Sequence, residues 1–310
     1  MNIKQIRNTL LLVLTALIWG CTFVALSVGA EYVGALTFLA SRCWVAGIVL
    51  LAVVAATDTR NKHAGKPTGA PKTREDKRTL ITGGIACGIF LFLAASTQQI
   101  GIAQTTTAKA SFITTLYVLI VPFLTLFMGK KVGKKIWICV ALGVVGLYLL
   151  CITGGLSLGW GDTMVLVCAF FFACHILTID HFSPKTDALR MSCIQFFAAA
   201  TLSTVCMFLF EHPTWTNIQA AILPILYAGI MGYGVGFTLQ IVAQKDLNPT
   251  IASLAMSLEG VFGALAGWVL LGQGLTIREF IGCALMFAAI VLAQLPDEWF
   301  SKKKKSSSEP

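Results

Sequence analysis

Residues 80–100 read LITGGIACGIFLFLAASTQQI, a run that contains no charged side chain. A helix needs about 20 apolar residues to cross the hydrocarbon core of a bilayer, and this run is long enough. Its apolar and polar residues do not alternate, which excludes a strand of an outer-membrane barrel. Because lipid offers no partner to backbone N–H and C=O groups, we predict a transmembrane helix here.

Similar apolar runs occupy most of the chain. Only 12% of the 310 residues are charged and 56% are hydrophobic, whereas soluble domains carry roughly a quarter charged residues. The mean hydropathy is +0.80. We therefore predict an all-α integral membrane protein, multi-pass in the cell (cytoplasmic) membrane and in contact with the lipid bilayer. The ten predicted transmembrane helices cover residues 9–29, 33–56, 80–100, 105–128, 135–152, 161–181, 188–210, 218–242, 249–271 and 277–295.

The positive charges predict how the chain is oriented. Cytoplasmic loops of membrane proteins are enriched in Lys and Arg. If the N-terminus is cytoplasmic, every Lys and Arg except Arg42, Lys109 and Arg278 falls in a cytoplasmic loop or end. We therefore predict that both termini are cytoplasmic, that residues 57–78 form a cytoplasmic basic loop, and that residues 297–310 form a disordered basic tail.

Charge and cysteine placement argue against other kinds of site. The net charge is +9, but the basic residues lie beside apolar spans and lack the interleaved aromatic residues of a nucleic-acid surface. The ten cysteines lie in or beside apolar segments, without a CxxC or Cys/His metal spacing. We therefore expect no nucleic-acid partner, no metal and no cofactor.

Two segments of the chain resemble each other. Residues 103–117 read AQTTTAKASFITTLY, and residues 243–259 read AQKDLNPTIASLAMSLE. Each has an Ala-Gln pair, a polar stretch and an Ala-Ser pair, and six residues after the Ser comes Tyr117 or Glu259. The segments fall in the fourth and ninth predicted spans. Because the copies lie five spans apart, the second copy is predicted to be inserted upside down, as in many secondary transporters. The two-fold axis relating the halves is then expected to bring Tyr117 and Glu259 to one central cavity.

Further motifs occur at Trp19-Gly20, at Arg42, and in KASFITTLYVLIVPFLTLFMGKK (109–131), GLYLL (146–150), GDTMVLVCAFFFACHI (161–176) and SLEGVFGALAGWVLLGQ (257–273). On these motifs the chain resembles the drug/metabolite transporter superfamily and its EamA-like family. The resemblance implies two inverted five-helix EamA-like repeats, at residues 9–152 and 161–295. It also implies transport of small organic solutes, often outward, across the cytoplasmic membrane.

Glu259 is the one acidic residue well inside a predicted span. Insertion scales put a midspan charge at about 2.5–3.5 kcal/mol, so such residues usually face a cavity or a partner. We predict either that Glu259 binds a substrate amine or a proton, or that it joins two helices by a hydrogen bond. Protons are accordingly a candidate coupling ion.

Arg42 lies near the middle of the second predicted span and stays charged at any relevant pH. It could bind a substrate carboxylate or phosphate through paired hydrogen bonds, or it could tie its helix to carbonyl groups of a neighbour. Its partner in the repeat is the neutral Gln195.

Other polar and aromatic residues in the spans are candidates for the solute pathway. Lys109 could instead extend to the membrane surface, and a single buried His175 could be structural. The pathway candidates are Trp19, Arg42, Gln99, Lys109, Tyr117, His175, Tyr233, Gln240 and Glu259, and Gln98 is a further amide of the same kind.

These features favour a secondary transporter for a small organic metabolite, such as an amino acid or an amine, that works by alternating access and exports its substrate. The alternatives are a membrane-embedded enzyme acting on a lipid, and a channel. The sequence has no P-loop for ATP-driven transport and no acidic pair in a membrane segment to hold a catalytic metal. Neither does it repeat a ring-forming motif of the kind that builds channel filters.

The predicted orientation can be tested by chemical labelling. In a background without native cysteines, Gly155→Cys and Glu211→Cys should react with an impermeant thiol reagent added outside the cell. Gly65→Cys and Ser306→Cys should react only after the membrane is opened, because the positive-inside rule places them in the cytoplasm. Labelling of Gly65→Cys in intact cells would reverse the orientation.

Overall fold

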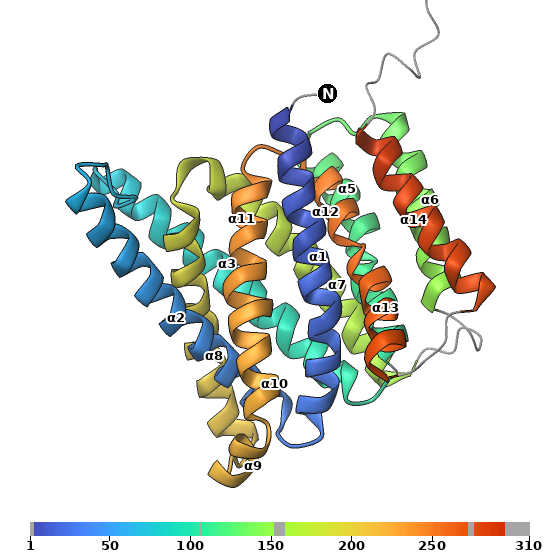
Figure 1. Cartoon of the computed structure of the whole chain (residues 1–310), viewed down its shortest axis with the longest axis horizontal. Helices are drawn as coiled ribbons and strands as arrows, with labels where there is room; N and C mark the ends of the chain where they lie inside the picture. Colours follow the sequence, from blue (N-terminus) through green and yellow to red (C-terminus); the bar gives the residue numbers. More distant parts are fainter. Residues whose placement is uncertain (1–2, 106, 152–158, 272–275, 295–310) are drawn as a thin grey trace, which may run out of the picture.

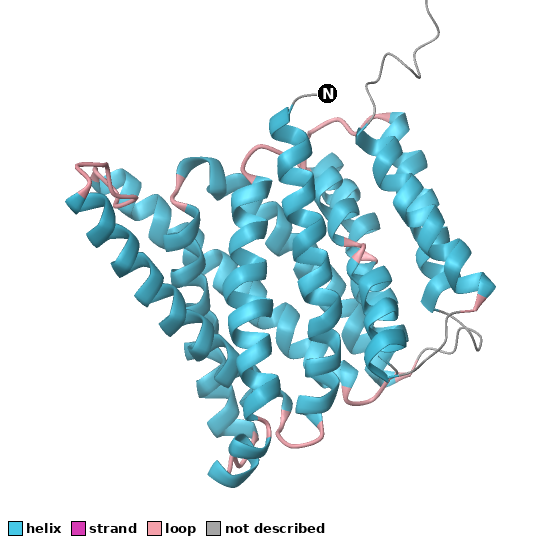
Figure 2. Cartoon of the chain, in the orientation of Figure 1, coloured by secondary structure: helices cyan, strands magenta, loops and turns pink. Residues whose placement is uncertain are grey.

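The computed structural model describes residues 3–105, 107–151, 159–271 and 276–294, and within these ranges all regular structure is helical (Figures 1 and 2). The helices are α1 Ile3–Ala30, α2 Ala35–His63, α3 Arg74–Ile102, α4 Thr107–Thr115, α5 Tyr117–Phe127, α6 Lys134–Cys151, α7 Trp160–Phe182, η1 Ser183–Lys185, α8 Ala188–Phe210, α9 Trp215–Ala220, α10 Ile222–Tyr227, η2 Ala228–Phe237, α11 Thr238–Gln244, α12 Pro249–Met256, α13 Glu259–Leu271 and α14 Ile277–Gln294. Helix is present in each of the ten ranges predicted as spans.

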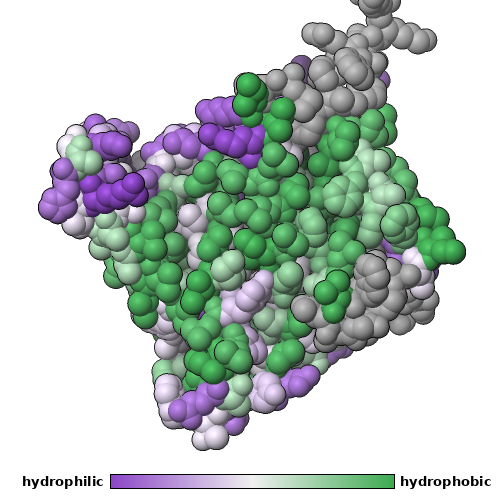
Figure 3. Space-filling model, in the orientation of Figure 1, coloured by the Kyte–Doolittle hydropathy of each residue, from purple (hydrophilic) through white to green (hydrophobic). Residues whose placement is uncertain are grey.

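The surface has the composition of a membrane protein. In the described residues, seven helical segments are long and apolar enough to cross a membrane. Figure 3 shows apolar side chains over the middle of the molecule, while polar side chains gather at its ends. The segments predicted as spans five, nine and ten are not among these seven, so the count of ten spans stays a prediction.

Helix extends into both ends of the range predicted as a basic loop. α2 continues to His63, and α3 begins at Arg74, which limits the connection to residues 64–73. Thr73 and Asp76 form a capping box in which each side chain accepts a 3.0 Å hydrogen bond from the other's backbone N–H. Hydrogen bonds to the Asp76 carboxyl, first from the Thr73 side chain and then from the Thr73 backbone N–H, hold its pKa below its usual range. The predicted loop was too long because helices can extend beyond the apolar core.

The helices pair in a way that relates the two halves. α2 packs against α8 and α6 packs against α14, so each pair joins the corresponding helices of the two sequence repeats. α3 packs against α7, and α1 packs against η2 and α11. If each helix is replaced by its counterpart in the other repeat, the α3–α7 contact becomes the contact of α1 with η2 and α11. This pattern is the one expected of a two-fold arrangement, although the inverted insertion itself stays a prediction.

The core contains four apolar clusters, and the two largest lie on either side of the space described below. One includes Leu12, Val118 and Leu147 and extends across α1, α5 and α6, whereas the other includes Leu91 and Phe196 and lies among α3, α8 and their neighbours. Trp19 of α1 and Phe172 of α7 pack against both of these clusters. The space between the clusters is therefore bounded by aromatic rings.

Small residues allow helices to approach closely at the contact of α1 with α13. A Cβ added at Gly20 would lie 2.7 Å from the backbone N of Gly263 and 2.8 Å from the carbonyl carbon of Phe262. Backbone atoms cannot move aside as a flexible side chain can. Glycine at residue 20 therefore sets the distance between these helices, as small residues commonly do in membrane bundles.

We expect Gly20→Ala to lower the stability of the protein by about 1–3 kcal/mol, because the added methyl group forces the α1–α13 contact apart. Thermal unfolding in detergent, followed by size-exclusion chromatography, measures the effect. Gly133→Ala is a matched control, since a Cβ there meets no atom within 4 Å. Equal midpoints for the two variants would contradict the close contact.

Candidate substrate-binding cavity

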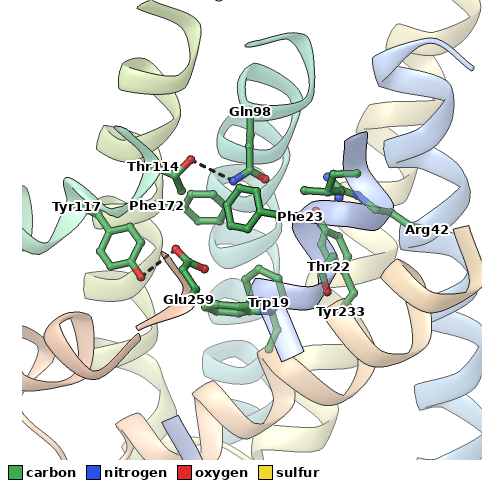
Figure 4. A pocket seen from close by; sticks show the side chains of 12 residues that line it. Trp19, Thr22, Phe23, Arg42, Gln98, Thr114, Tyr117, Phe172, Tyr233 and Glu259 are labelled. Carbon is green, nitrogen blue, oxygen red and sulfur yellow. Dashed lines mark hydrogen bonds between the residues drawn. The ribbon is translucent and has the colours of Figure 1, made fainter. Parts of the chain in front are cut away.

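A cavity of about 40 Å³ lies between the two apolar clusters (Figure 4). This volume holds a few water molecules, whereas small-molecule sites measure about 300–1,000 Å³, so the cavity must widen to admit a solute. The walls are mainly apolar and aromatic, and a few polar groups face the space. The lining residues are Trp19, Thr22, Phe23, Leu26, Arg42, Gln98, Thr114, Tyr117, Phe172, Tyr233, Phe237 and Glu259.

Two helices are interrupted at equivalent positions beside this cavity. α4 ends at Thr115 and α5 begins at Tyr117, whereas α12 ends at Met256 and α13 begins at Glu259. At each interruption a hydroxyl bonds back to its own helix. Thr115 Oγ1 donates to carbonyl groups one turn earlier at 2.9 and 3.0 Å, and Ser257 Oγ does the same at 2.8 Å. Such bonds bend helices, so both copies of the repeat bend just before their polar residue.

Tyr117 and Glu259 meet at the cavity. The Tyr117 hydroxyl donates a 3.2 Å hydrogen bond to Glu259 Oε1. Their side chains are 3% and 4% exposed, and Figure 4 shows them facing each other. The sequence repeat aligns these two residues, and the structure brings them together across the interface between the two halves.

Arg42 enters the cavity from α2 on the side away from Tyr117 (Figure 4). It is 1% exposed, and its guanidinium carbon lies 4.6 Å from the ring centre of Tyr233 and 5.4 Å from that of Phe38. Within the described part of the chain, its Nε and Nη2 atoms have no hydrogen-bond acceptor. Aromatic rings stabilise the charge but provide no acceptor oxygen.

The π-helical segment η2 supplies one aromatic wall. It carries Tyr233 and Phe237, whose ring centres are 5.1 Å apart. Trp19 packs 4.7 Å from Phe237 and donates a 2.9 Å hydrogen bond from Nε1 to the carbonyl of Gly232. π-helical turns widen a helix by one residue and frequently occur at functional sites. Sequence reasoning did not predict this change of helix type.

Gln98 faces the cavity, but the predicted Gln99 does not line it. Gln98 Nε2 donates to Thr114 Oγ1 at 3.3 Å (Figure 4). Gln99 instead donates to the backbone carbonyl of Leu26 at 3.0 Å. One residue along a helix rotates a side chain by about 100°, which places the two amides on different faces.

Three other candidates fall outside the cavity wall or outside the described side chains. His175 Nε2 lies 3.1 Å from Gln195 Oε1, and both side chains are fully buried where α7 meets α8. Gln240 is buried in α11 and is not among the lining residues. Lys109 belongs to α4, but its side chain lies outside the described residues.

Several lining residues were not singled out from the sequence. Thr22, Phe23 and Leu26 follow Trp19 at the spacing of one helix face, which is the signal that could have found them. Phe172 lies one turn before His175 on α7 and gave no distinct signal, because apolar residues occur on every face of a membrane helix.

The cavity combines one guanidinium, one carboxyl and several aromatic rings. In the described residues, no group of three or more His, Cys, Asp or Glu side chains could hold a metal ion. This set of groups can bind a small charged organic molecule by hydrogen bonds and ring contacts.

Comparisons with known proteins identify the family and the fold. The sequence profile of the EamA-like transporter family matches residues 7–152 and again residues 159–295. An uncharacterized transporter of Archaeoglobus fulgidus is 28% identical over 298 residues, covering 95% of this chain and 88% of that protein. The uncharacterized inner membrane transporter YedA of Escherichia coli K12 is 22% identical, covering 93% and 90%. A solved crystal structure has the same fold, with a TM-score of 0.76 at 18% identity, and covers 96% of this chain and 99% of that chain.

Removal of the Tyr117 hydroxyl should destabilise the protein. Tyr117→Phe leaves a buried carboxyl without this donor, at a cost of about 1–3 kcal/mol, so the midpoint of thermal unfolding in detergent should fall by several degrees. Tyr148→Phe is the control, because Tyr148 is 38% exposed. An unchanged midpoint for Tyr117→Phe would mean that the bond to Glu259 does not support the fold.

Proposed function

Because the chain belongs to the EamA-like transporter family, we propose that it is a secondary transporter that exports a small organic metabolite across the cytoplasmic membrane. One observation carries the proposal. The two interrupted helices of the repeat present Tyr117 and Glu259 to one cavity. Interrupted helices at corresponding positions of two halves are the feature that marks the substrate site of many transporters.

Polar contacts at the two ends of the α2–α8 pair support alternating access. At one end, both Glu211 carboxylate oxygens accept 2.8 Å hydrogen bonds, from the backbone N–H groups of Leu36 and Thr37 at the start of α2. At the other end, Arg190 at the start of α8 pairs with Asp58. Each contact joins the beginning of one helix to the end of its counterpart. Rocking of one half against the other would open these contacts in turn.

A second set of contacts follows the same pattern. Lys4 near the start of α1 pairs with Asp246, beyond the end of α11, at 2.9 Å. Thr105, beyond the end of α3, donates to Asp162 at the start of α7. Exchange of the two halves relates these contacts. We propose that both sets close the pathway at the two membrane surfaces, with Lys4, Asp58 and Arg190 at the cytoplasmic one.

Glu259 is the group that we propose for binding the polar head of the substrate or a coupling proton. It lies at the cavity rather than between two helices alone, because it lines the space in which a solute would sit. The removal of its charge should therefore affect transport more than folding.

Counterflow in proteoliposomes tests this proposal. Vesicles are loaded with unlabelled metabolites that accumulate in cells lacking the protein, and uptake of the labelled form is followed. Glu259→Gln should lower the initial exchange rate by at least about tenfold, equivalent to about 1.4 kcal/mol, and should elute as the wild type does in size-exclusion chromatography.

Glu279→Gln is the matched control, because Glu279 caps the start of α14 by accepting hydrogen bonds from Thr276. It should exchange solute at the wild-type rate. Normal exchange by Glu259→Gln would leave Glu259 with a structural role, and the absence of saturable exchange for every solute would contradict the transporter itself.

A further inference from the structure

Two pathway candidates from the sequence, His175 and Gln240, do not line the central cavity. Their side chains are 0% and 1% exposed, on α7 and α11. Within the described residues, His175 Nδ1 and Gln240 Oε1 have no hydrogen-bond partner. Buried polar atoms in folded proteins are usually paired, so each exception needs a physical reason.

Two further buried amides next to them share this feature. Gln195 of α8 and Gln244 of α11 are 0% and 1% exposed. In the described part of the chain, Gln195 Nε2 and Gln244 Oε1 lack a partner. The other amide atom of each is in use. Gln195 Oε1 lies 3.1 Å from His175 Nε2, and Gln244 Nε2 donates a 3.4 Å hydrogen bond to the carbonyl of Ile176.

These four side chains belong to one region, in which α7, α8 and α11 come together. α11 packs against both α7 and α8. Thr238 Oγ1 of α11 donates a 3.0 Å hydrogen bond to Ser192 Oγ of α8, one turn before Gln195. We call this region the polar seam, and its members are His175, Gln195, Gln240 and Gln244.

The polar seam lies between the central cavity and a closed end of the molecule. On the cavity side, the ring of His175 packs edge-on against the ring of Phe237, with their centres 5.5 Å apart, and Phe237 lines the cavity. On the other side, Gln244 lies two residues before Asp246, the partner of Lys4. The Lys4–Asp246 contact is one of those that we proposed to close the pathway at the cytoplasmic surface.

A purely structural role explains the seam glutamines poorly. An amide that only joins helices stabilises them most when both of its ends are hydrogen-bonded, because an unpaired buried atom opposes folding. Within the described residues, every glutamine of the seam leaves one end unpaired. Apolar side chains would fill the same space without that penalty. The seam is therefore better matched to a second state, in which water reaches its unpaired atoms.

We propose that the polar seam lines the cytoplasmic half of the solute pathway, which is closed in this structure. This inference rests on the proposed transport function. In the inward-facing state α11 separates from α7 and α8, and water and solute enter between them from the cytoplasm. In the closed state these surfaces meet, and His175 and Phe237 separate the cavity from the cytoplasm.

Thiol accessibility tests where the cytoplasmic half runs. In a background without native cysteines, Gln195→Cys, Gln240→Cys and Gln244→Cys are treated in inside-out membrane vesicles with an impermeant methanethiosulfonate. The control keeps only native Cys193, which precedes Gln195 by two residues on α8 but contacts the carbonyl of Gly47 on α2 at 3.8 Å. Each seam cysteine should react at least about tenfold faster than Cys193, because the inward-facing state is populated for part of the time.

Leucine substitution separates a pathway from a structural role. Gln240→Leu removes the unpaired amide and nearly keeps the size of the side chain. The midpoint of thermal unfolding in detergent should stay the same or rise, because the closed state loses an unpaired polar atom. The initial rate of counterflow should fall about tenfold, since opening would then hydrate an apolar surface. Gln219→Leu, at an exposed position of α9, is the control and should exchange solute at the wild-type rate.

The outcomes distinguish this inference from the proposed function. If the seam cysteines react no faster than Cys193, or if Gln240→Leu exchanges solute at the wild-type rate, the inference is wrong. Saturable counterflow by the wild-type protein would in that case still support transport. Fast labelling of the seam in a protein that exchanges no solute would instead support the opening of the seam and contradict the transport function.

Discussion

Backbone hydrogen bonding inside lipid is the constraint on which this structure depends. A hydrocarbon layer offers no partner to N–H and C=O groups, so each crossing segment must be helical. Departures from regular helix in the middle of a span are correspondingly informative. In the described chain they occur before Tyr117, before Glu259 and along η2, and all three places border the same cavity. The protein accepts irregular backbone where it surrounds a space for a ligand.

Two buried ionisable groups of the spans also lie at this cavity. Arg42 and Glu259 are each close to fully buried, and both line the cavity rather than filling a position in the apolar core. Other described ion pairs, such as Lys4–Asp246, lie near helix ends where water is close. Close helix contacts such as that of Gly20 with Gly263 let apolar surfaces exclude lipid around this polar centre. Packing and polarity thus occupy separate zones of the bundle.

The sequence was sufficient for the helical segments and for the central pair of residues. Apolar runs predicted where helix occurs, and the repeat alignment predicted that Tyr117 and Glu259 meet. The sequence could not show that Gln98 rather than Gln99 faces the cavity, because this depends on the rotation of α3 about its axis. It also could not predict η2, since a π-helical turn arises from packing of neighbouring helices rather than from local propensity. The sequence did not indicate that Phe172 lines the cavity, because every face of a transmembrane helix carries apolar residues.

The pairing of Tyr117 with Glu259 breaks the symmetry of the two halves. The two residues occupy the same place in the two copies of the sequence repeat, directly after the bend made by Thr115 or Ser257. Two identical subunits related by symmetry would have to place tyrosine against tyrosine, or glutamate against glutamate, at this point. Two copies that have different sequences can instead place a donor against an acceptor, as Tyr117 and Glu259 do. The single chain can therefore offer a solute different groups on the two sides of the cavity, which a pair of identical subunits could not do.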